Sequence, residues 1–134
     1  MRKIYKIVIH CSDSPDSSDI GFVEINKFHK EKGWKSISNI ACGYHFLIRK
    51  NGVIEVGRTI DEAGAHVQGA NFDSIGICLI GRNNFSDQQF ESCKRLIRSL
   101  KNQYNNVTIH GHNEFASAKL QGKTCPNFEI KNIL

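Results

Sequence analysis

Two histidines, a lysine and a cysteine lie close together in the last quarter of the chain. His110 and His112 are one residue apart, and Lys123 and Cys125 follow after a polar gap. Histidine and cysteine are common zinc ligands, and zinc with three protein ligands keeps a fourth position open for catalysis. A nearby lysine can stabilise negative charge on a substrate. The stretch therefore suggests part of a catalytic zinc site that needs a further ligand from elsewhere.

The first strand of the chain offers that ligand. The β-branched run Ile7-Val8-Ile9 predicts a buried strand, and His10 stands where it ends. His112 also follows a short predicted strand, and α/β proteins place their chemistry at strand ends. His10, His112 and Cys125 could thus form one metal site, although their spacing matches no local zinc-finger pattern. The remaining histidines are assigned by context: His29 and His45, within a predicted helix and a predicted strand, are expected to be structural.

The sequence pattern predicts a single α/β domain spanning residues 1–134. Strands are expected at 4–10, 44–49, 53–56, 74–80 and 107–109, and helices at 22–32 and 86–104. The second helix begins with a capping box formed by Ser86 and Gln89. Residues 64–71 are expected to be a surface loop over the sheet. This order of elements predicts a central mixed β-sheet flanked by helices, with the candidate zinc site at one edge of the sheet.

The bulk composition is that of an ordinary globular protein. The chain has 134 residues, a net charge of +5, 40% hydrophobic and 23% charged residues, which suits one domain with one core. No nucleic-acid partner is expected, because the aromatic residues lie mainly on core stripes instead of alternating with basic residues on one face. No membrane span is expected, and we expect a monomer.

The start of the chain and its cysteines bear on localisation. Charged residues at positions 2, 3 and 6 interrupt what would have to be the apolar part of a signal peptide. The five cysteines are an odd number and suit a reducing compartment, where they are buried or bind metal. The sequence therefore predicts cytoplasmic synthesis without a signal peptide.

Six short motifs occur in a familiar order. Together they resemble the zinc-dependent N-acetylmuramoyl-L-alanine amidases of the type 2 amidase and peptidoglycan recognition protein superfamily, phage endolysins above all. The resemblance covers nearly the whole chain, and its strength lies in the order of the motifs. They are Val8-Ile9-His10-Cys11-Ser12, Gly43-Tyr44-His45-Phe46-Leu47-Ile48, Gly64-Ala65-His66, Ser74-Ile75-Gly76-Ile77-Cys78-Leu79, His112-Asn113-Glu114 and Lys123-Thr124-Cys125-Pro126.

The resemblance implies a role for each matching position. His10, His112 and Cys125 match the three zinc ligands of the family, which leaves His110 as a strand residue that points elsewhere. Tyr44 and Lys123 match its catalytic pair.

The resemblance also implies which residues contact the substrate. His66 matches a residue of the substrate groove, and Asn71 at the end of the same loop is expected to contact substrate as well. The chain departs from shorter relatives in residues 115–122, which are expected to form an extended loop at the rim.

The implied activity is hydrolysis of the amide bond between N-acetylmuramic acid and L-alanine in bacterial peptidoglycan, with Zn²⁺ as cofactor. An endolysin would act on the cell wall after its release from the cytoplasm. Two alternatives stay open: a cytoplasmic amidase that recycles muropeptides, and a non-catalytic peptidoglycan-binding module. The presence of Cys125, Tyr44 and Lys123 favours an enzyme, because a binding module could lose the third ligand.

Overall fold

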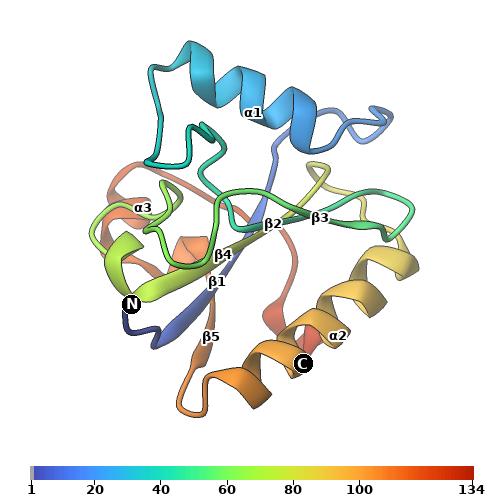
Figure 1. Cartoon of the computed structure of the whole chain (residues 1–134). Helices are drawn as coiled ribbons and strands as arrows, with labels where there is room; N and C mark the ends of the chain where they lie inside the picture. The colour runs from blue at the N-terminus through green and yellow to red at the C-terminus, as the bar shows by residue number, and fades with distance from the viewer. Residues whose placement is uncertain (1) are drawn as a thin grey trace.

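A five-stranded mixed sheet forms the centre of the computed structural model, which describes residues 2–134. The strands are β1 (Lys6–Cys11), β2 (Phe46–Ile48), β3 (Ile54–Val56), β4 (Ser74–Leu79) and β5 (Thr108–Gly111). Their order across the sheet is β3-β2-β4-β1-β5. β2, β4, β1 and β5 run parallel, and β3 pairs antiparallel with β2 at the edge. This confirms the predicted mixed sheet (Figure 1).

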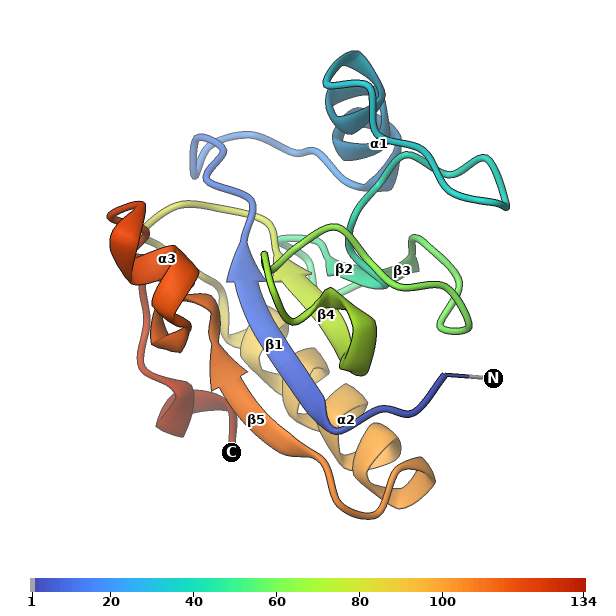
Figure 2. The same cartoon turned by 90° about the vertical axis from the view of Figure 1, so that its left-hand side faces the viewer.

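Within residues 2–134, three α-helices flank the sheet: α1 (Phe22–Glu31), α2 (Asp87–Gln103) and α3 (Ala116–Leu120). Short 3₁₀ turns cover residues 71–73, 112–114 and 130–133. In Figure 2 the arrowheads of β1 and β5 point toward the side of the molecule where α1 and α3 lie, and α2 lies behind the sheet. No helix within residues 2–134 is both long enough and apolar enough to cross a membrane.

The two central strands direct their side chains to two different environments. Alternate residues of a strand point to opposite faces, and one face of β1 and β4 is mainly aliphatic. It packs against Cys93, Ile97 and Leu100 of α2, and burial of each such isoleucine contributes about 1.5–3 kcal/mol. The residues of this face are Ile7, Ile9, Ile75, Ile77 and Leu79.

The opposite face of the same strands carries small and polar residues. β1 contributes Val8 and His10, and β4 contributes Ser74, Gly76 and Cys78, all of them buried or nearly so. β1 and β4 therefore have one face for the core and one for the candidate site.

The helix α2 begins as predicted. The Ser86 hydroxyl accepts a hydrogen bond from the Gln89 backbone N–H at 3.1 Å, and the Gln89 side chain accepts one from the Ser86 N–H at 2.9 Å. This capping box satisfies two backbone donors that would otherwise lack partners. Gln89 is also buried, where its amide donates to the carbonyls of Ile48 and Ile80.

Of two expectations about loops, one is wrong and the other holds only in part. Residues 115–122 are not an extended loop, because Ala116–Leu120 form α3, which buries Ala118 and is followed by Gly122 at φ +70°. Alanine, lysine and leucine favour helix, and a glycine with positive φ is a common helix stop. Residues 64–71 do form a loop over the sheet, but only part of it lies at the surface: Gln68 and Gly69 are exposed, whereas Val67 is 1% exposed and packs on Val8 of β1.

Candidate active site

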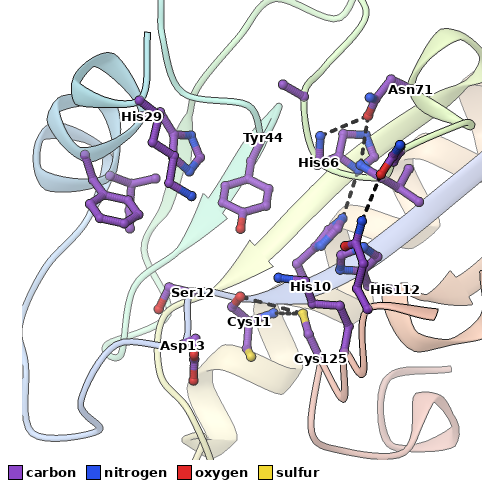
Figure 3. Close-up of a pocket in the computed structure, with 18 of the residues that line it drawn as sticks. His10, Cys11, Ser12, Asp13, His29, Tyr44, His66, Asn71, His112 and Cys125 are labelled. Carbon is purple, nitrogen blue, oxygen red and sulfur yellow. Dashed lines mark hydrogen bonds between the residues drawn. The ribbon is translucent and has the colours of Figure 1, made fainter. Parts of the chain in front are cut away.

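A cleft of about 770 Å³ opens at the carboxyl ends of the parallel strands. β1 supplies His10, the segment before β2 supplies Tyr44, and the loop before β4 supplies His66. His112 begins the 3₁₀ turn directly after β5, and Cys125 comes from the loop after α3. Figure 3 shows these side chains converging from five segments of the chain.

Three of the lining residues form a potential metal site. One ligand atom each from His10, His112 and Cys125 lies within 4.8 Å of the others, and no second such group of His, Cys, Asp or Glu occurs within residues 2–134. The pairing of β1 with β5 sets Ile9 opposite Gly111, which places the following residues of both strands side by side. The structure therefore brings together the three residues that the sequence suggested as ligands.

Backbone hydrogen bonds fix the third member of this group. The N–H of Cys11 donates to the Cys125 sulfur at 2.9 Å, and the N–H of Asn113 donates to the Cys125 carbonyl at 2.9 Å. The first bond orients the sulfur, and the second ties the loop of Cys125 to the turn that carries His112. A backbone N–H aimed at a sulfur also stabilises its thiolate form.

Burial sets the protonation states of these groups. Desolvation, together with His66 and His112, lowers the pKa of His10 well below its usual value, and desolvation and Lys123 lower that of His112. Both imidazoles are therefore neutral at pH 7, the form that binds a metal. The Cys11 thiol and desolvation raise the pKa of Cys125, so a metal ion must displace a proton from this thiol.

His66 lies behind His10 and away from solvent. Its Nδ1 is 2.8 Å from Nε2 of His10, its Nε2 is 3.2 Å from the Ser74 hydroxyl, and the residue is 8% exposed. Asn71 accepts hydrogen bonds from the N–H groups of His66 and Val67 through its side-chain oxygen. Both His66 and Asn71 line the cleft. Their expected contact with substrate stays a prediction.

The two residues expected to be catalytic also line the cleft. The ring of Tyr44 is 5.2 Å from that of His10 between centroids. Burial, reinforced by neighbouring thiols, raises the pKa of Tyr44 well above its usual value, so its phenol stays protonated. Lys123 is exposed on the loop before Cys125, near enough to His112 to lower the pKa of that imidazole.

The residues of one wall of the cleft were not among the site residues predicted from the sequence. Phe28, His29 and Lys32, at the end of α1, and Trp34 line the cleft opposite His10. The ammonium of Lys32 lies 4.7 Å from the Phe28 ring and 5.0 Å from the Trp34 ring. A signal was present in the helical spacing: His29 is four residues after the buried Ile25, so both lie on the inner face of α1.

The other histidines lie where the sequence predicted. His110, on β5, contacts Thr108 and Glu114 instead of the metal group. His45 is fully buried and accepts a hydrogen bond from the Gly76 N–H at 3.0 Å. His29 accepts one from the Gly43 N–H at 2.8 Å, so it has a structural role as well as a place in the wall.

Comparisons with known proteins agree with this geometry. The family model described as N-acetylmuramoyl-L-alanine amidase matches residues 1–128. The endolysin of Klebsiella phage KP32 is 37% identical over 134 residues, with 94% of this chain and 82% of the endolysin covered.

Solved structures are also similar. The N-acetylmuramoyl-L-alanine amidase LysC from Clostridium intestinale superposes with a TM-score of 0.81 at 31% identity, over 98% of this chain and 83% of LysC. A point mutant of Drosophila PGRP-LB, in complex with tracheal cytotoxin, gives a TM-score of 0.76 at 25% identity, over 94% and 76% of the two chains.

Proposed function

This chain belongs to the N-acetylmuramoyl-L-alanine amidase family, and from that premise we propose how its cleft performs the reaction. The chain is a peptidoglycan amidase of the phage endolysin type. Water is added across the amide bond between the lactyl group of N-acetylmuramic acid and L-alanine. The acyl carbon gains the hydroxyl and the alanine nitrogen gains the proton.

We propose that His10, His112 and Cys125 hold one zinc ion. Zinc binds histidine nitrogen at about 2.0 Å and cysteine sulfur at about 2.3 Å. The three ligand atoms already lie within 4.8 Å of one another, so small side-chain rotations would bring all of them to one ion. Two neutral imidazoles and one thiolate are also the donor set that zinc prefers. This clustering is the observation that carries the proposal.

Zinc bound there would lower the pKa of a water molecule to about 7 and polarise the amide carbonyl. The residues of the chain then act on the charges that develop. The Lys123 ammonium stabilises the negative charge on the carbonyl oxygen as the carbon becomes tetrahedral. The protonated Tyr44 hydroxyl donates a hydrogen bond to the same tetrahedral centre and helps to pass a proton to the leaving amine.

The experiment combines metal analysis with digestion of purified sacculi. Protein purified without chelators should contain one zinc per chain, and sacculi should release L-alanine amino termini without new reducing sugar ends. Full activity without zinc would contradict the proposed metal site, and new reducing ends would contradict the amide bond as the target. Intact sacculi and soluble muropeptides are tested side by side, because a recycling amidase would prefer the soluble fragments.

A further inference from the structure

His66 occupies a space that the fold keeps free for a ring. A Cβ atom added at Gly76 of β4 would lie 2.7 Å from Cγ of His66, and one at Gly64 would lie 2.6 Å from Cδ2. Both separations are shorter than side-chain carbons tolerate, so glycine is required on both sides of the imidazole. The Asn71 side chain holds the backbone of His66 from a third direction. The position of this ring is therefore built into the structure.

A chain of hydrogen bonds runs from this ring in both directions. Nδ1 of His66 meets Nε2 of His10 at 2.8 Å, and Nε2 of His66 meets the Ser74 hydroxyl at 3.2 Å. The Ser74 hydroxyl in turn donates to the Ala70 carbonyl at 2.7 Å. Both ring nitrogens of His66 are thus used by protein partners (Figure 3 shows the link to His10).

The Ala70 carbonyl, at one end of this series of hydrogen bonds, sets the direction of each bond in the series. A carbonyl can only accept, so Ser74 donates its proton to Ala70 and can accept only from His66 Nε2–H. A neutral imidazole carries one proton, so Nδ1 of His66 then accepts from His10 Nε2–H. His10 is left with an unprotonated Nδ1.

We propose that His66 and Ser74 are positioning residues that fix His10 as the Nε2–H tautomer and present its Nδ1 to the metal. This inference rests on the proposed zinc site, and it gives His66 a task other than the substrate contact expected from the sequence. Metal-binding histidines generally donate their second N–H to a protein acceptor, which fixes the tautomer and the orientation of the ring. Here the acceptor is another imidazole, itself oriented by a buried serine.

The matched variants His66→Asn and His66→Leu separate this role from simple packing. Both side chains are smaller than histidine and have similar shapes, but only asparagine keeps an oxygen near the position of Nδ1 to accept from His10. Zinc affinity is measured by competition with a chromogenic chelator, and thermal unfolding in EDTA confirms that each variant is folded. His66→Leu should bind zinc about 10- to 100-fold more weakly than the wild type, as removal of such a partner does elsewhere. His66→Asn should recover most of this loss.

Equal affinity of the two variants, whether both lose zinc or both keep it, would overturn the proposal. Ser74→Ala gives a second test, because it removes the acceptor that orients His66 and leaves the ring itself in place. Ser74→Ala should weaken zinc binding by a smaller factor than His66→Leu. An unchanged affinity would count against the proposed hydrogen-bond relay, the series of bonds from His10 through His66 and Ser74 to Ala70.

The tautomer of His10 gives a readout that needs no zinc. Long-range ¹⁵N–¹H correlation spectra of the metal-free protein, with the His10 signals identified by their absence in His10→Asn, should show the proton on Nε2. A proton on Nδ1 would overturn the positioning role even if zinc binds. An Nε2 proton in a protein that binds no zinc would instead refute the proposed metal site and leave the hydrogen-bond relay standing.

Discussion

The wall of the cleft that carries His10 is a strand of the sheet, with His66 packed behind it from the loop before β4. The opposite wall is a helix that few hydrogen bonds join to the rest of the molecule. His10 lies on a central strand with partners on both sides. α1 is anchored by the buried Ile25 and by two hydrogen bonds from the segment before β2. The Gly43 N–H donates to the His29 ring, and the Cys42 N–H donates to the Asn26 side-chain oxygen, each at 2.8 Å. Backbone hydrogen bonds to β4 and β5 hold β1 on both sides, while α1 has a few side-chain anchors.

The division matches what each wall has to do. The proposed metal ligands must keep their geometry before and after substrate binds, and for His10 burial on a central strand provides this rigidity. A peptidoglycan strand is bulky and varied, so we expect a wall that contacts it to present an adaptable, exposed surface. Phe28 on α1 is 54% exposed, whereas His10 is 1% exposed. We infer that the sheet wall determines catalysis and that the α1 wall determines affinity.

The largest effect should come from the metal ligands. Cys125→Ser and His112→Gln should each lose zinc and lower turnover about a thousandfold or more, because a metal ion supplies several kcal/mol of transition-state stabilisation. The matched control is His110→Gln, on β5 two residues before His112, which should keep both zinc and activity. Zinc content and sacculus digestion are measured on the same samples. If the His110 variant were as inactive as the His112 variant, the assignment of His112 instead of His110 as the metal ligand would be wrong.

Loss of the charged group at the rim should have the next largest effect. Lys123→Ala should keep its zinc and lower kcat about a hundredfold, the typical result of removing one donor to a developing oxyanion. The exposed Lys119 of α3 is a suitable control, and Lys119→Ala should change kcat little. Stopped-assay kinetics on soluble muropeptides separate kcat from KM, and a Lys123 variant that changes only KM would show a binding role instead.

Acid should loosen the α1 wall through His29. Burial lowers the pKa of His29 from 6.5 to about 4. Between pH 6.5 and pH 4, His29 is therefore protonated in the unfolded chain but stays neutral in the folded chain. The stabilisation is fully present above pH 6.5 and is lost as pH falls toward 4, by about 3 kcal/mol across the window. Urea unfolding in EDTA at several pH values measures this loss, and His29→Asn should reduce it. An unchanged pH dependence in that variant would exclude His29 as the source.

The smallest effect should come from the exposed aromatic ring of α1. Phe28→Ala should raise KM about three- to tenfold and leave kcat within about twofold, because one aromatic contact contributes about 1 kcal/mol. Val23→Ala is the control, since Val23 is 69% exposed on the same helix and does not line the cleft. If Phe28→Ala changed kcat as much as KM, the separation of the two walls would be wrong.

The sheet wall was also the more predictable of the two from sequence. The run Ile7-Val8-Ile9 indicates a buried strand by local pattern alone, and strand alternation puts His10 on the face opposite Ile9. The α1 wall depends on contacts that no local pattern encodes. The His29 imidazole, for example, accepts from the Gly43 N–H, and the Asn26 side-chain oxygen accepts from the Cys42 N–H, so α1 is joined to a segment 14 to 16 residues further along the chain.

The relay behind His10 was beyond the sequence for a similar reason. Ser74 is the first residue of a strand and is ordinary by type, and its role appears only once Ala70 and His66 lie beside it. The helix α3 was missed because five residues are too few for a periodic pattern. Tertiary packing determines which side chains of distant segments form hydrogen bonds. Such bonds can therefore be identified only once the fold is known.

The position of β1 in the middle of the sheet has a consequence for how the protein folds. β1 begins at Lys6, yet its two partners begin at Ser74 and Thr108, so its pairing closes very long loops, which is slow. His10 meets His112 and Cys125 only when the last of these pairings has formed. Zinc should then bind only to fully folded chains and stabilise them by mass action. Metal occupancy would thus report the completion of folding, and incomplete chains would carry no hydrolytic centre.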